Sequence, residues 1–249
     1  MRSYVDSGVV EKIRAAGGEV FAISSEPQHL ANQAHEHWDL NFDNIGDPHQ
    51  EIPRVCDERD LLTLYANRGD TEFLQRGADW TVEHPKGFFQ PGVLAVTQSS
   101  RILYRWRSVP SDKNLNGTVA RPTADHVWRS IDGSLRAGDA AGHSAHDDNP
   151  EVDSGPPRVA VFMAALIANG WFLRVKSFVY SPGVASTPAR LKKALSRWPP
   201  FIIAWLAAFV WLPTLWVSIG LVSWLVWIVM DIRSATGRMD IQEEIKPSR

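Results

Sequence analysis

The side chain best suited to covalent chemistry is Cys56, the single cysteine among the 249 residues. A thiol becomes a nucleophile when a helix N-terminus or nearby cations lower its pKa. The charged neighbours Arg54, Asp57, Glu58 and Arg59 roughly cancel one another. We therefore expect Cys56 to be a small buried apolar residue, with a role in disulfide chemistry as the alternative. A single cysteine also excludes an internal disulfide and zinc sites that need several cysteines.

The histidines form two groups with some potential for metal binding. His29, His35 and His37 share a predicted helix, but gaps of 6 and 2 residues place them on different faces. A helical metal pair needs a gap of three or four residues. His143 and His146, followed by two aspartates, have better spacing but lie in a segment without periodicity. We therefore predict neither a metal site nor a cofactor.

No other spacing predicts catalysis or phosphate binding by a known motif. Ser24 and Ser25 lack histidine and aspartate partners at a spacing typical of a nucleophilic triad, and Gly17–Gly18 lacks the pattern of a phosphate loop. The formal net charge is −2, which gives no general attraction to nucleic acid. We therefore expect no nucleic-acid partner.

The elements that must position these residues form an α/β pattern over residues 1–133. Apolar periodicity predicts the helices, and continuous or alternating apolar runs predict the strands, the first of them covered on both faces. In chain order we expect a helix at 5–13 ended by Gly17, a strand at 20–24, a helix at 27–38, a strand at 40–42, a helix at 49–58, a β-hairpin from 93–97 and 101–106, and a helix after Pro122.

Several segments of this domain, in order, resemble the peroxiredoxin-like group of thioredoxin-fold proteins, the alkyl hydroperoxide reductase and thiol-specific antioxidant family. The segments are EVFAISSEPQHLANQA, LNFDNIGDPHQEI, QPGVLAVTQSSRILYRWRS, NLNG and RPTADHVW. The resemblance implies a thioredoxin-like α/β domain over 1–133 and a cis peptide bond before Pro91, which would face the active-site turn. An ordinary trans proline that begins a strand is the alternative.

The resemblance has one departure that bears on activity. In that family a central strand and a catalytic Cys-x-x-Cys-type turn precede the first helix, whereas here the helix begins almost at Met1. Cys56 lies in the helix after Gly46–Asp47–Pro48 and not at the nucleophile position. We therefore expect an incomplete thioredoxin-like domain, α-β-α-β-α…β-β-α, that lacks its peroxidatic cysteine. A truncated start or a degenerate paralogue would explain this pattern.

The longest apolar run spans residues 201–230, which contain no charged residue. As one straight helix its 30 residues would be about 45 Å long, against a bilayer core of about 30 Å. Pro213 divides the run, so one tilted and kinked helix and a hairpin that enters and leaves on one face both remain open, with a buried soluble helix pair as the third interpretation. Four tryptophans suit the membrane interface: Trp198, Trp205, Trp224 and Trp227.

The remaining segments complete the domain organisation. Residues 134–157 are rich in small and polar residues and predict a disordered linker. Residues 158–200 predict an amphipathic and basic juxtamembrane region, with 159–173 either interfacial or packed on the first domain. A polar tail follows at 231–249. Residues 186–200, before the apolar run, contain four Lys and Arg, and the run is followed by Arg233, Arg238 and Lys246. This bias and the polar start of the first domain, which does not resemble a signal peptide, favour a cytoplasmic N-terminal side.

Two functions fit these observations. One is a membrane-anchored peroxiredoxin-like antioxidant protein, inactive as this chain, that would work with a thiol redox partner. The other is a non-catalytic, membrane-tethered thioredoxin-like module for binding or scaffolding. Both predict the lipid bilayer as a partner of residues 201–230.

Overall fold

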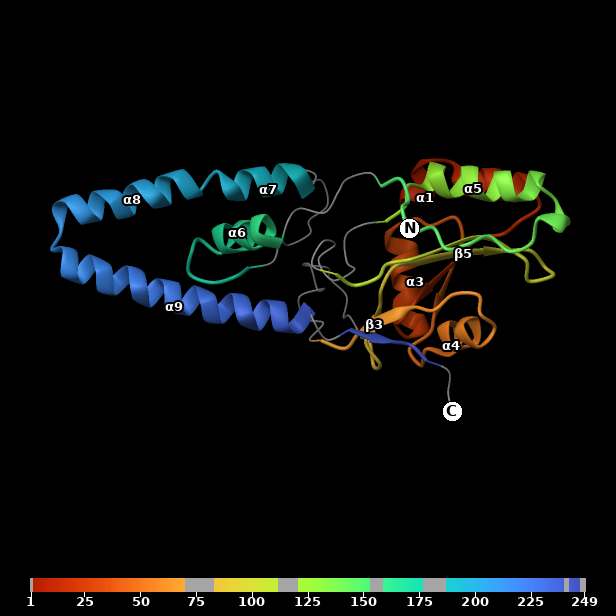
Figure 1. The fold of residues 1–249 in the computed structure, drawn as a ribbon, viewed down its shortest axis with the longest axis horizontal. Helices are drawn as coiled ribbons and strands as arrows, with labels where there is room; N and C mark the ends of the chain where they lie inside the picture. Colours follow the sequence, from red (N-terminus) through yellow and green to blue (C-terminus); the bar gives the residue numbers. More distant parts are fainter. Residues whose placement is uncertain are drawn as a thin grey trace. The chain divides into compact units, whose positions relative to one another are not determined.

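The chain folds into two compact units, each described here by itself (Figure 1). The computed structural model describes residues 2–69, 83–111, 121–152, 159–176, 187–239 and 242–246. The first unit contains the described residues up to 152 together with 242–246, and the second contains 159–176 and 187–239. The first unit is therefore discontinuous in sequence.

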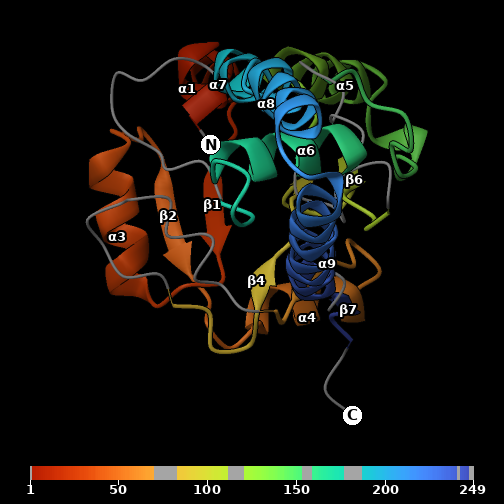
Figure 2. The ribbon, with the colours of Figure 1, turned by 90° about the vertical axis from the view of Figure 1, so that its left-hand side faces the viewer.

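A parallel β-α-β unit begins the first unit. β1 (Phe21–Ser24) pairs with β2 (Asp43–Gly46), and α3 (Gln28–His37) makes the connection that a parallel pair requires. Figure 2 shows α3 beside the two strands. The second strand lies later than the predicted 40–42, because Leu40 and Phe42 are buried core residues that precede the pairing.

The first helix and strand differ in how well the sequence predicted them. The predicted first helix is confirmed in two pieces, α1 (Arg2–Asp6) and α2 (Val9–Ala15), and Gly17 adopts a φ of 81° just beyond them. The expectation that the first strand is covered on both faces is wrong. Phe21 and Ile23 of β1 are 54% and 42% exposed, because alternate residues of the strand point away from the core.

The predicted β-hairpin is confirmed as β5 (Gly92–Val96) and β6 (Ile102–Arg107). α5 (Ala124–Arg136) packs on β6 through a cluster of buried side chains. The cluster consists of Leu103, Tyr104, Trp106, Val127 and Ile131. The Thr123 hydroxyl accepts a hydrogen bond from His126 N and caps the start of α5.

A third sheet joins residues from opposite ends of the chain. β3 (Tyr65–Asn67) lies between β4 (Phe88–Phe89) and β7 (Gln242–Glu244), both antiparallel to it. Ile245, next to β7, is buried and donates its N–H to Leu64 O at 2.9 Å. α4 (Glu51–Glu58) confirms the helix predicted at 49–58 and precedes this sheet in sequence. The segment expected to be a polar tail therefore contains a strand of the first unit.

The segment predicted to be a disordered linker has, up to residue 152, a defined structure within the first unit. α5 extends to Arg136, a 3₁₀ turn η2 (Asp139–Ala141) follows, and the next residues run along β6. Ser144 N donates to Ile102 O, and Asp147 N donates to Arg105 O at 3.0 Å. These contacts are backbone hydrogen bonds, which small and polar residues can form. Such a segment therefore shows no apolar periodicity from which its structure could be predicted. Residues 153–157 of the expected linker, and the expected closing loop at 114–117, lie outside the described residues.

The second unit is helical. After α6 (Val159–Asn169) and α7 (Thr187–Leu195), α8 (Trp198–Trp211) and α9 (Thr214–Met239) run antiparallel to each other (Figure 1). The chain reverses at Leu212 and Pro213, where extended backbone before the proline ends α8. The apolar run therefore forms two helices, as the hairpin interpretation expects, and not one continuous helix.

α6 lies between α7 and α9 in Figure 1. Its Ala165 and Ala168 share a buried cluster with Phe172, Ala194 of α7 and Ile228 of α9. Aromatic side chains complete the packing: the rings of Phe172 and Phe201 stack with centroids 3.8 Å apart. The contacts that bury α6 are therefore made within the second unit.

Candidate functional site

Cys56 is half-buried in α4 and has a free thiol. Burial raises the pKa of this thiol, and the nearby Arg59 lowers it only in part. A raised pKa keeps the sulfur protonated at neutral pH, and the thiol is a much weaker nucleophile than the thiolate. The environment of Cys56 therefore disfavours thiol chemistry, in line with the neutral charge balance of its sequence neighbours.

The prediction of a cis peptide bond before Pro91 is wrong, because the described residues contain no cis bond. Pro91 lies where the chain enters β5, and its carbonyl accepts a hydrogen bond from Ser108 N at 2.8 Å. Gln90 N donates to Tyr65 O at 2.7 Å. A backbone that is hydrogen-bonded on both sides of the proline is typical of an ordinary trans proline at the start of a strand.

The first unit contains an open hollow of about 630 Å³ near the ends of several strands. Its lining residues come from α4, from the end of β3 and from the segment before β4, and they carry cationic or small side chains. They are Arg54, Arg68, Gly69, His84, Pro85, Lys86 and Gly87. Among the residues that the structure describes, the lining includes three permanent cations and no carboxylate, so the hollow is suited to an anion.

His84 is held in the hollow by Ser25, the buried residue that follows β1. The Ser25 hydroxyl oxygen lies 2.9 Å from His84 Nδ1 and also accepts a hydrogen bond from Phe89 N at 3.1 Å. The Ser25 oxygen has a second lone pair as well as a proton, so its contact with Nδ1 is compatible with either neutral tautomer of His84. Burial lowers the pKa of His84 to about 4, so the ring is neutral at pH 7.

The Ser25–His84 pair has the distance of a nucleophile and its base, but its surroundings do not suit that role. Ser25 is only 4% exposed. Among the residues that the structure describes, no carboxylate hydrogen-bonds to the His84 ring to orient it, as a triad requires. The pair therefore fixes the orientation of the His84 ring. Sequence reasoning missed it because the partners are 59 residues apart.

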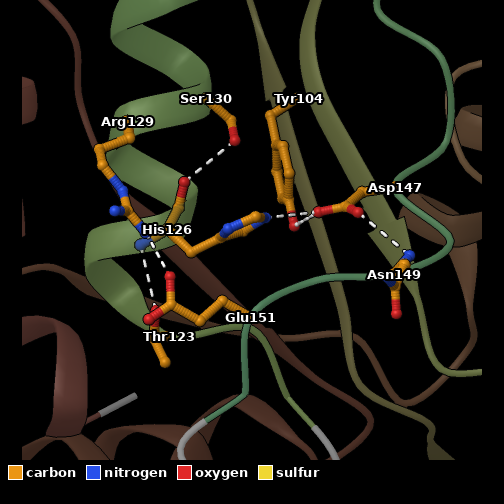
Figure 3. A network of polar contacts seen from close by, with 8 residues as sticks. All are labelled: Tyr104, Thr123, His126, Arg129, Ser130, Asp147, Asn149 and Glu151. Atoms are coloured by element: carbon orange, nitrogen blue, oxygen red, sulfur yellow. Dashed lines mark hydrogen bonds and ion pairs between the residues drawn. The ribbon is translucent and has the colours of Figure 1, made fainter.

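A second polar cluster joins the expected linker to α5 and β6 (Figure 3). Tyr104 donates its hydroxyl to Asp147 Oδ2 at 2.9 Å, and His126 Nε2 lies 2.7 Å from the same oxygen. Asn149 N donates to the other carboxylate oxygen at 3.2 Å. Burial and the adjacent Asp147 raise the pKa of Tyr104, so the phenol remains a donor. Each group in this cluster is satisfied by another, which indicates a structural role.

The histidines considered for metal binding have other partners. His143 Nδ1 accepts a hydrogen bond from Ile102 N at 3.1 Å, and His146 forms a backbone bridge with Arg105. His35 Nδ1 lies 3.1 Å from Phe42 O. Within the described ranges, no group of three His, Cys, Asp or Glu side chains is placed to hold a metal ion.

The second unit presents apolar side chains to its surroundings. Two helices, Ala189–Trp211 and Thr214–Gly237, are long and apolar enough to cross a membrane. Near the turn, Val210, Trp211 and Trp216 are 70% to 80% exposed. The hairpin is thus compatible with membrane association. Comparison of the chain with protein-family models, with curated proteins and with solved structures finds no match.

Proposed function

We propose that this protein is a membrane-anchored α/β module that binds a ligand or partner and does not use thiol chemistry. The observation that carries the proposal is the apolar hairpin α8–α9, whose side chains are exposed between the flanking charges Arg197 and Asp231. Exposed apolar patches larger than a few hundred square ångströms are rare on soluble monomers. A bilayer would cover both arms at once.

The hairpin also supports a topology in which the chain enters and leaves the bilayer on one side. The described residues before α6 belong to the first unit, and β7, which begins three residues after α9 ends, pairs with β3 of that same unit. A single folded unit cannot lie on both sides of a membrane. The first unit and the strand β7 therefore share one side, and the Lys and Arg residues that flank the hairpin, with none in its turn, favour the cytoplasmic side.

The relationship to peroxiredoxin-like proteins stays a proposal with partial support. The parallel unit β1–α3–β2 and the later order β5–β6–α5 occur in the sequence expected of a thioredoxin-like domain. Against an antioxidant activity stand the raised pKa of Cys56 and the trans bond before Pro91. The binding module is consequently the function that the geometry supports better.

Alkaline carbonate extraction of membranes from expressing cells tests the anchor. We expect the full chain in the pellet. Replacing two exposed arm residues by lysine, Leu206→Lys with Val226→Lys, costs about 2.5–3.5 kcal/mol per charge near the centre of a bilayer and should release the protein or block its insertion. Leu135→Lys, the same change at an exposed position of α5, is the matched control and should leave the protein in the pellet. Release of the unaltered chain would contradict the proposal.

A further inference from the structure

We infer that the hollow lined by Arg54, Arg68, His84 and Lys86 binds a phosphate group, carried by a soluble small molecule or by a lipid headgroup. The inference names a ligand for the binding function proposed above. Its volume of about 630 Å³ falls within the range of small-molecule sites. None of the described lining residues has a large apolar side chain, so charge and hydrogen bonding would determine which ligands the hollow accepts.

The three cations differ in how they are held. Arg54 lies on α4, whose first turn is fixed by the Asp47 carboxylate through hydrogen bonds from Glu51 N and Ile52 N at 2.9 and 2.8 Å. In the described part of the chain its guanidinium is paired with no carboxylate. Its charge is therefore available to a ligand, and a guanidinium can bind two oxygens of one phosphate.

Arg68 and Lys86 are oriented by described neighbours, and these contacts use only part of their donor capacity. Arg68 Nε lies 2.8 Å from Glu243 Oε2 of β7, which positions the guanidinium and leaves further N–H groups. Within the described residues, the Lys86 ammonium makes a single long contact of 3.4 Å with His49 O, while Gln50 Nε2 donates to the Lys86 carbonyl at 2.7 Å. The backbone at Lys86 is thus fixed and its ammonium can turn to an anion.

His84 adds a neutral donor beside these charges. Ser25 holds Nδ1, and when its hydroxyl donates to Nδ1 the neutral ring carries its proton on Nε2. A neutral N–H donor with fixed orientation favours an acceptor such as a phosphate oxygen and requires no protonation at pH 7. The hollow therefore combines mobile positive charge with one oriented donor.

The full-length protein in detergent micelles, titrated calorimetrically, tests the inference. The two probes are inorganic pyrophosphate and glycerophosphoinositol bisphosphate, the water-soluble headgroup of a phosphoinositide. We expect one of them to bind. Arg54→Gln and Lys86→Gln should each weaken that binding by about tenfold or more, because a hydrogen bond to a charged group is lost. Stronger binding of the headgroup would indicate a lipid source, and equal or stronger binding of pyrophosphate a soluble one.

Arg59→Gln is the matched control, because Arg59 follows the same helix and does not line the hollow. It should leave the affinity unchanged, and melting temperatures equal to that of the unaltered protein would show that each variant folds. Absence of binding to both probes would overturn the inference, as would equal weakening by Arg59→Gln. Since the titration is done in detergent, failure of membrane anchoring would not affect it.

Discussion

His126 Nε2 and Asp147 Oδ2 lie 2.7 Å apart although 21 residues separate them in the chain. The contact joins the first half of α5 to the segment that returns along β6, and Tyr104 of β6 donates to the same carboxylate oxygen. One carboxylate thus holds together a helix, a strand and a segment that has no regular structure of its own. Its removal should loosen all three.

Asp147→Asn should lower the free energy of unfolding of the first unit by about 1–3 kcal/mol, because the amide nitrogen cannot accept the hydrogen bonds that the carboxylate oxygen accepts. Urea unfolding followed by tryptophan fluorescence measures this. Asp148→Asn, at the exposed neighbouring position, is the control and should have little effect. Equal stability of the two variants would mean that the cluster contributes nothing.

The Asp147 carboxylate should also make the stability of the first unit depend on pH. Burial alone would raise the pKa of Asp147, but hydrogen bonds from His126, Tyr104 and Asn149 N outweigh it and leave the pKa below its ordinary value. The folded state thus favours the ionised form. This contribution is complete above pH of about 4, the unfolded value, and is lost as the pH falls through the folded value. The unfolding curves of Asp147→Asn should lack this acid-side loss.

Ile245→Ala should destabilise the third sheet by about 2–5 kcal/mol, because Ile245 is buried beside β7 and its backbone bonds to Leu64. Hydrogen exchange read by mass spectrometry should show faster exchange of the amides in β3. Lys246→Ala, at the next and exposed residue, serves as the comparison. Unchanged exchange in β3 would exclude the pairing of β3 with β7.

Cysteine labelling should show that the chain before the hairpin and the chain after it lie on the same side of the membrane. In a Cys56→Ser background, cysteines introduced at the exposed positions Gln98 and Lys246 should react with an impermeant maleimide from the same side of sealed vesicles. A cysteine at Thr214, in the turn, should react only from the other side or not at all. Opposite labelling of Gln98 and Lys246 would require a single span.

Cys56→Ser should leave peroxide consumption by the purified chain at the background rate, since burial keeps this thiol protonated. A coupled assay with a dithiol reductant would measure the rate. Turnover by the unaltered chain that disappears in Cys56→Ser would make Cys56 a nucleophile and favour the antioxidant function.

Local patterns predicted the elements whose partners are close in sequence. The β5–β6 hairpin and the helices α3 and α4 follow from alternation or helical periodicity in short windows, which one stretch of sequence contains in full. The strand β7 could not be predicted, because Gln242–Glu244 is polar and becomes a strand only when β3 supplies its partner. Likewise Ser25 meets His84 through tertiary folding and not through a spacing visible in the chain.

The pairing of Asn67 with Gln242 also sets an order of events during synthesis. The ribosome makes β3 long before β7, and the whole apolar hairpin is made between them. Until the hairpin has been made and the chain has returned, one edge of β3 has no strand to pair with, and unpaired edges promote aggregation. Under the proposed membrane anchoring, completion of the first unit would report that the hairpin is in place, and a failure of insertion would produce an incompletely folded protein that cellular proteases can recognise.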